Sequence, residues 1–211
     1  AHCAIELAEQ VARSILAHTP AHRPDFGVEI APTGWMTLQL TDRAVADWLQ
    51  LVLQPFLQSP QGDEPSSGLS CFPAQYAHAR CCSLLQLAYR EGAIGYSLLE
   101  ERHMTAIEPI PWLDPECQTL RVRHPAERQL VSQLVNTVDA IATTHPQNYT
   151  KLALRLSQSF EEFYSQCRFL GTLPTVNPRL AEVRIGLLGV TQILLQQLLE
   201  QKLRISSPIA L

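Results

Sequence analysis

The stretch Phe72-Pro-Ala-Gln-Tyr76-Ala-His78-Ala-Arg80-Cys-Cys-Ser83-Leu-Leu-Gln-Leu-Ala88 decides the fold of this chain. At 100° per residue its apolar side chains fall on one arc, which predicts a helix with one buried side. A second stripe on another side of the same helix carries a tyrosine and two arginines. The arc comprises Ala77, Cys81, Leu84, Leu85 and Ala88, and the stripe comprises Tyr76, Arg80, Ser83, Leu87 and Arg90.

The second stripe has two interpretations. An aromatic ring beside guanidinium groups is the chemistry that binds unstacked bases and phosphates. A polar stripe on a helix is, however, more often an ordinary solvated surface. The pattern by itself therefore leaves both a nucleic-acid interface and a solvated helix face open.

Composition places the chain among soluble globular proteins. Its 211 residues are 46% hydrophobic and 17% charged, enough for one sizeable core. No apolar run reaches the length of a membrane span, and six cysteines without a C-x-x-C pair indicate reduced thiols and a cytoplasmic location. The chain begins with Ala1 rather than methionine, so we expect that a preceding segment exists.

Charge limits how the chain could bind nucleic acid. The formal net charge is −4, and only Lys151 and Lys202 are lysines. Residues 1–54 carry three arginines against six acidic side chains. Because nucleic-acid affinity scales with the number of phosphates neutralised, any RNA binding must be local and geometric. Arginine suits that purpose through bidentate phosphate contacts and base stacking.

Hydrophobic periodicity and a stretch rich in proline, glycine and serine divide the chain into three parts. A helix over 4–19, strands over 26–30 and 35–40, and a helix over 43–53 predict a small α/β module at 1–54. Prolines, glycines and serines mark 55–70 as a linker. Residues 71–211 then predict a helical domain, so the expected fold class is mainly α, a helical bundle preceded by a small α/β module. After its first helix, the helical domain is expected to contain a break and a polar stretch over 91–106 and a proline-interrupted loop over 107–115. Helices are then expected over 124–143, 146–170 and 178–202.

The organising stretch resembles a segment of class I arginyl-tRNA synthetases. Their anticodon-binding domain, the DALR domain, opens with QYAHAR-x-x-S, and here Gln75 to Ser83 reads QYAHARCCS. The resemblance continues through Phe160, Phe163-Tyr164 and Cys167-Arg168, and it ends near Pro208–Leu211. It implies an all-helical anticodon-binding bundle over 71–211.

The first module resembles part of the appended N-terminal domain of the bacterial enzymes of this family. The matching residues are Val28 to Leu40 and Ala46-Asp47-Trp48-Leu49. In the family this domain touches the D-loop of tRNA, which implies contacts from Trp35 and Thr37. The alternative is that Trp35 and Trp48 pack the interior of the small module.

The resemblance implies a set of RNA-contacting residues but no catalysis. The anticodon-arm candidates are Gln75, Tyr76, His78, Arg80 and Arg168. The expected partner is a tRNA, with arginine-accepting tRNA as one candidate, or another structured RNA. Pro73 stands where the family commonly carries a further aromatic ring, so we expect weakened stacking. The linker stands in place of the catalytic domain, and no HIGH-like or KMSKS-like motif is present, so we expect that the chain activates no amino acid and needs no cofactor.

A second function class remains open, a protein–protein adaptor that keeps the scaffold without binding RNA. The acidic balance favours it, and the glutamines of the last helix would form its contact surface: Gln192, Gln196, Gln197 and Gln201.

His78 and Cys82 lie one helical turn apart, but without a second ligand pair we expect packed side chains rather than a metal site. The scattered histidines and serines give no legible nucleophile–base set.

Overall fold

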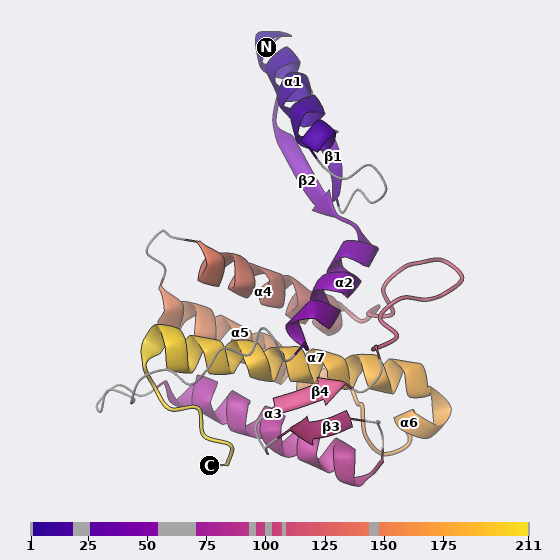
Figure 1. Cartoon of the computed structure of the whole chain (residues 1–211), viewed down its shortest axis with the longest axis vertical. Helices are drawn as coiled ribbons and strands as arrows, with labels where there is room; N and C mark the ends of the chain where they lie inside the picture. The colour runs from indigo at the N-terminus through magenta and orange to yellow at the C-terminus, as the bar shows by residue number, and fades with distance from the viewer. Residues whose placement is uncertain are drawn as a thin grey trace. The chain divides into compact units, whose positions relative to one another are not determined.

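A computed structural model describes residues 2–18, 26–54, 71–92, 96–99, 103–106, 109–143 and 148–210. The chain forms two compact units: unit 1 is Ala1–Trp48 with Leu113–Leu120, and unit 2 is Leu49–Trp112 with Arg121–Leu211. The predicted fold class, mainly α with a small α/β module, is confirmed (Figure 1). The predicted linker, 55–70, lies outside the described residues.

Unit 1 contains one complete helix and one hairpin. Helix α1 spans His2–His18, and strands β1 (Phe26–Ile30) and β2 (Met36–Leu40) pair antiparallel with Val28 opposite Leu38. Gly34 closes the hairpin with φ +85°, and a Cβ there would lie 2.9 Å from the Cβ of Ala4. The turn therefore requires glycine both for its backbone conformation and for its close approach to α1.

Helix α2 (Asp42–Val52) begins in unit 1, where the Thr41 hydroxyl accepts a hydrogen bond from the Ala44 N–H at 3.1 Å. Leu113–Leu120 belongs to the same unit, because the Leu120 N–H donates to the Asp42 carboxylate at 2.9 Å. The division between units falls after Trp48 rather than at residue 54. Its physical reason is that Leu49 and Leu53 at the end of α2 are buried, 0% and 1% exposed, within unit 2.

Unit 2 is a helical bundle around α7 (Pro178–Gln197). The helices α3 (Phe72–Arg90), α4 (Pro125–Ala142) and α5 (Tyr149–Gln166) all pack against α7 (Figure 1). Every residue from Ile185 to Leu195 is buried. The expected glutamine-rich outer face is therefore wrong at Gln192, which is 1% exposed, because α7 is surrounded by other helices there.

Local signals set the starts of these helices. At α4 the His124 imidazole accepts from the Ala126 N–H, and the Glu127 carboxylate accepts from the His124 N–H, which forms a capping box. Asn148 and Asn177 cap α5 and α7 through side-chain oxygens that accept backbone N–H groups. Prolines at the first turns of α3, α4 and α7 lack an N–H that a helix leaves unpaired there.

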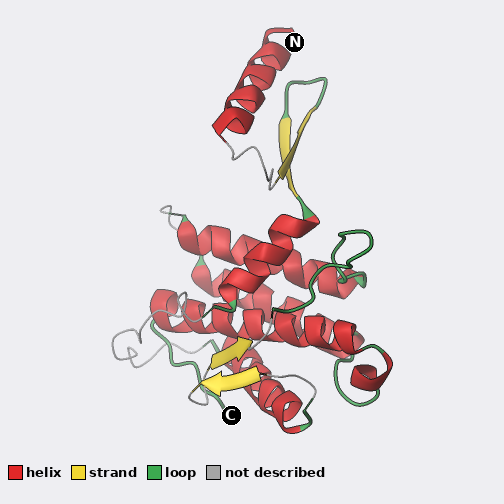
Figure 2. Ribbon diagram, turned by 45° about the vertical axis from the view of Figure 1, so that its right-hand side comes forward, coloured by secondary structure: helices red, strands yellow, loops and turns green. Residues whose placement is uncertain are grey.

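Three features of unit 2 differ from the pattern-based expectations (Figure 2). Strands β3 (Tyr96–Leu99) and β4 (His103–Ala106) form a hairpin where a polar stretch was expected. A short helix, α6 (Leu173–Val176), lies between the expected helices 146–170 and 178–202. The last helix changes to a π-helix, η2 (Leu198–Leu203), and ends at Arg204 with φ +56°.

Ile110 and Trp112 are buried in unit 2. Trp112 is 3% exposed, and a Cβ at Gly186 of α7 would lie 2.6 Å from its ring. The Gln50 side-chain oxygen accepts from the Trp112 indole N–H at 3.1 Å and from the Ile110 N–H at 2.9 Å. The glycine therefore lets an indole reach the surface of α7, and Gln50 satisfies the polar groups that become buried.

Candidate nucleic-acid interface

Three side chains at four-residue spacing run along one side of α3. The rings of Phe72 and Tyr76 are stacked with centroids 6.2 Å apart and planes inclined by 27°. The guanidinium carbon of Arg80 lies 5.9 Å from the centroid of the Tyr76 ring. An Arg80 N–H also donates to the Tyr76 hydroxyl at 3.0 Å. This row follows directly from helical spacing, since residues four apart share a face.

Tyr164 of α5 extends the row from outside α3. The Arg80 guanidinium lies 4.4 Å from the centroid of the Tyr164 ring, within cation–π range. Burial lowers the pKa of Arg80, but hydrogen bonding and Coulombic attraction from Tyr164 and Tyr76 outweigh it and raise the pKa above its ordinary value. Arg80 is thus a permanent cation held between two tyrosines. We call Phe72, Tyr76, Arg80 and Tyr164 the aromatic column.

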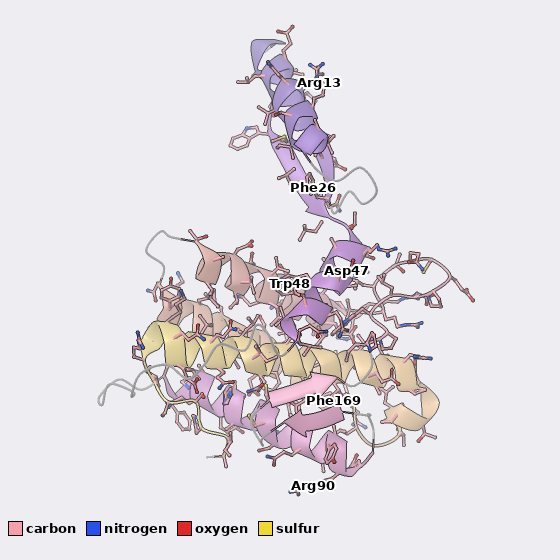
Figure 3. The ribbon with its side chains drawn as sticks, viewed as in Figure 1. Arg13, Phe26, Asp47, Trp48, Arg90 and Phe169 are labelled. Carbon is pink, nitrogen blue, oxygen red and sulfur yellow. The ribbon has the colours of Figure 1, made fainter. Side chains whose placement is uncertain are left out.

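Tyr164 is itself held by rings from its own and a neighbouring segment. Its ring lies 6.2 Å from Phe160 and 6.2 Å from Phe169, tilted in both cases. Phe169, labelled in Figure 3, stacks at 2° on Phe163 with centroids 6.1 Å apart. Because Phe160 and Phe163 are fully buried, they fix Tyr164 to the core of unit 2.

Gln75 and His78 face the C-terminal segment of the chain. The Gln75 amide donates to the Ser206 carbonyl oxygen at 3.1 Å. The His78 Nδ1 lies 2.9 Å from the Pro208 carbonyl oxygen, and the His78 Nε2 lies 3.0 Å from the Gln192 amide nitrogen. An amide N–H can only donate, so Nε2 accepts, and the Nδ1–H donates to the Pro208 carbonyl oxygen.

His78 is 1% exposed, so its ring has no surface to offer to an RNA. Both ring nitrogens are used inside the protein, and the RNA contact expected of His78 stays a prediction. The neighbouring Cys82 thiol lies 3.9 Å from each ring nitrogen. Among the residues that the structure describes, no group of three or more histidine, cysteine or acidic side chains gathers to bind a metal.

Arg168 lies between two buried residues, Cys167 and Phe169, and its own side chain is exposed. Its carbonyl oxygen accepts from the Arg184 guanidinium at 2.5 Å. Arg184 in turn forms a 2.6 Å ion pair with Glu127, whose side chain is 1% exposed. The buried pair thus fixes the backbone from which Arg168 projects, and Phe169 links this segment to Tyr164 of the aromatic column.

The two candidates from the first module lie in unit 1. Trp35 is 78% exposed beside the hairpin turn, so the alternative that it packs the interior of the module is wrong. Thr37 is exposed and pairs across the hairpin with Glu29, a negative side chain that disfavours a nearby phosphate. Trp48 is only partly exposed.

Sequence reasoning missed two members of the aromatic column, Phe72 and Tyr164. Phe72 precedes Tyr76 by four residues, so helical spacing alone would have placed it on the same stripe. It supplies an exposed ring one residue before Pro73, where the loss of a ring was inferred. Tyr164 entered the sequence analysis only as part of the family resemblance, and only the three-dimensional arrangement brings it to Arg80.

Comparisons with known proteins agree on one family. The family model described as the DALR anticodon binding domain matches residues 74–205. An arginine–tRNA ligase of Synechococcus sp. (strain JA-3-3Ab) is 27% identical over 186 residues, which are 88% of this chain and 28% of the relative. An arginine–tRNA ligase of Gloeobacter violaceus is 32% identical over 140 residues, 64% of this chain and 20% of the relative.

The chain therefore spans less than a third of the length of either relative. No solved structure matches it significantly. The resemblance to arginyl-tRNA synthetases that the QYAHAR motif indicated is confirmed. No helix within the described part of the chain is long and apolar enough to cross a membrane.

Proposed function

This chain belongs to the DALR anticodon-binding domain family, and from that membership we propose that it binds transfer RNA through unit 2 without catalysing aminoacylation. The observation that carries the proposal is the aromatic column on the surface of unit 2, of which Tyr76, Arg80 and Tyr164 lie within the matched residues 74–205. Phe72 is 62% exposed and Tyr76 is 40% exposed, and an arginine that stays charged supports them. Exposed rings beside a cation suit the splayed bases of an RNA loop.

The distribution of charge supports a small interface rather than an extended one. The chain carries 16 basic residues against 20 acidic ones. Stacking on aromatic rings is worth about 1–3 kcal/mol per base and depends little on net charge. The proposed RNA is a tRNA with arginine-accepting tRNA preferred, since the relatives are named arginine–tRNA ligases.

The absence of catalysis is the second part of the proposal. Nothing in the 211 residues resembles the HIGH and KMSKS motifs that this class of synthetase uses to bind ATP. Arginine-dependent exchange of pyrophosphate into ATP measures amino acid activation directly. We expect no exchange above the background of a buffer control, and robust exchange would contradict this part.

The adaptor hypothesis has less support. Its proposed contact surface on the last helix includes Gln192, which is buried against His78. Gln196 is only partly exposed, and its amide lies 3.3 Å from the Glu200 carboxylate. Because part of that surface is used within the protein, RNA binding is the function that we propose.

A binding assay with two arginine variants tests the RNA proposal. Fluorescence anisotropy of labelled arginine-accepting tRNA at low salt should give saturable binding to the intact chain. Arg168→Ala should weaken that binding and reduce its salt dependence by about one phosphate contact. Arg155→Ala, which removes an exposed arginine of α5, is the matched control and should leave the affinity unchanged. Equal affinities for both variants would contradict the assignment of Arg168 to the RNA interface.

A further inference from the structure

The four side chains of the aromatic column differ in which ring faces remain open. Phe72 precedes Tyr76 by one helical turn, and Arg80 follows Tyr76 by one turn. The Tyr76 ring therefore has a ring and a guanidinium as its neighbours along the helix, and it is 40% exposed against 62% for Phe72. The Tyr164 ring is covered by Arg80 at 4.4 Å. Phe72 and Tyr164 stand at the two ends of the column. Tyr164 also contacts the rings of Phe160 and Phe169, whereas the Phe72 ring is 62% exposed, so Phe72 is the open end of the column among the described residues.

The spacing inside the column leaves no room for a base between its members. Stacked bases are separated by about 3.4 Å, so insertion between two parallel rings needs about 6.8 Å. The Phe72 and Tyr76 centroids are 6.2 Å apart, and inclined rings approach each other more closely than their centroids. A base that stacks on this surface must therefore add to the end of the column.

We propose that Phe72 is the base-stacking platform of this chain, and that one unpaired nucleobase extends the column in the order base, Phe72, Tyr76, Arg80, Tyr164. This inference rests on the proposed RNA binding and assigns the ring that carries it. It differs from the expectation drawn from the motif, in which Tyr76 and Arg80 contact the RNA directly. In the structure those two residues support the platform from behind.

The position of Phe72 suits a rigid platform. It is the first residue of α3, and its neighbours Cys71 and Ala74 are buried, 4% and 0% exposed. In the same turn, Gln75 is hydrogen-bonded to the Ser206 carbonyl oxygen. The backbone under the ring is thus fixed from two sides, while the ring itself is 62% exposed. Little conformational entropy remains to be lost when a base stacks on it.

The ligand of this platform is defined by shape rather than by hydrogen bonding. A phenyl ring has neither donor nor acceptor, so it binds the face of any base and favours purines through their larger area. Anticodon-arm stem-loop RNAs that carry 2-aminopurine at successive loop positions are suitable probes, because the fluorescence of 2-aminopurine changes when it stacks on a ring.

Substitutions at Phe72, with a control at Tyr89 of the same helix, test the platform. Phe72→Leu keeps an apolar side chain of similar size but removes the π-face, and it should weaken binding by about 5- to 150-fold, the range for one lost base–aromatic stack. Phe72→Trp should retain or improve affinity. Tyr89→Phe changes an exposed ring of α3 outside the column, so affinity should change less than about threefold.

Each outcome decides the proposal. It is supported if the intact chain shifts the fluorescence of one loop position, Phe72→Leu abolishes that shift, and Phe72→Trp restores it. If the intact chain binds the RNA and Phe72→Leu binds equally well, the platform assignment fails while the proposed function stands. If the intact chain does not bind RNA at low salt, both fail. Circular dichroism checks that each variant is folded, which is expected because Phe72 is exposed.

Discussion

The imidazole of His78 lies 2.9 Å from the carbonyl oxygen of Pro208, which joins the first helix of unit 2 to the C-terminal segment across 130 residues of sequence. His78 belongs to the motif that identifies the family, yet its ring is buried. Gln75 makes a parallel contact with Ser206. Two motif residues thus hold the end of the chain in place, and the exposed rings beside them are left for a ligand.

Removal of the His78 ring should destabilise unit 2 and release the C-terminal segment. His78→Ala leaves the Pro208 carbonyl and the Gln192 amide without the ring, and an orphaned buried polar group costs about 1–3 kcal/mol. We expect urea unfolding to show a decrease of that size in the free energy of unfolding, and we expect faster tryptic cleavage after Arg204. Gln158→Ala, at an exposed position of α5, is the control and should change neither quantity. Wild-type stability in His78→Ala would show that the contact contributes nothing.

The Arg184–Glu127 pair should be worth far more than an exposed pair. Glu127 is 1% exposed, so Arg184→Ala leaves an uncompensated buried charge, which typically costs about 3–5 kcal/mol. The exposed pair Arg179–Glu182 on α7 provides the matched comparison, and Arg179→Ala should cost less than about 1 kcal/mol. Chemical denaturation measures both. Similar losses for the two variants would contradict the assigned burial of Glu127.

Alkaline pH should destabilise unit 2 through its buried thiols. Burial raises the pKa of Cys82 from its ordinary 9.0 to about 12 and also raises the pKa of Cys81. The folded chain therefore keeps a proton that the unfolded chain releases above pH 9, so stability is full below that pH and falls as the pH rises towards 12.

Cys82→Ala should flatten this decline by up to about 1.4 kcal/mol per pH unit, the value for one proton. Urea unfolding between pH 8 and the alkaline limit of the folded state, compared between the two proteins, measures the difference. Cys117→Ala, which removes an exposed thiol, should follow the wild-type curve. If the free energy of unfolding falls with pH equally in wild type and Cys82→Ala, folding does not protect the Cys82 thiol from deprotonation.

Periodicity predicted the regular elements well because each depends on local patterns. The expected helices and the first hairpin begin and end within a few residues of α1, β1, β2, α2, α3, α4, α5 and α7. The second hairpin was missed because its strands are short and lack an Asn-Gly or Asp-Gly turn signal. The π-helical end of the last helix leaves no sequence signature that the helical period would detect.

The candidate site was harder to predict because its geometry depends on contacts between distant residues. Gln192 was assigned to the surface as a polar side chain on a helix, but a hydrogen bond to His78 makes its burial tolerable. Helical spacing brings Tyr76 and Arg80 together and extends to Phe72. The pairing of Arg80 with Tyr164 follows from the packing of α3 on α5, which no local pattern encodes.

The salt dependence of tRNA binding tests the central claim most directly. The intact chain is titrated into labelled arginine-accepting tRNA and into total tRNA over a series of salt concentrations. We predict measurable binding at low salt, a preference for the arginine-accepting tRNA, and a shallow slope of about −1 to −3 in log K against log salt, since each neutralised phosphate contributes roughly −0.7 to −0.9. Absence of binding at the lowest salt, or a slope far steeper than −3 without preference among tRNAs, would contradict a local stacking interface on the aromatic column.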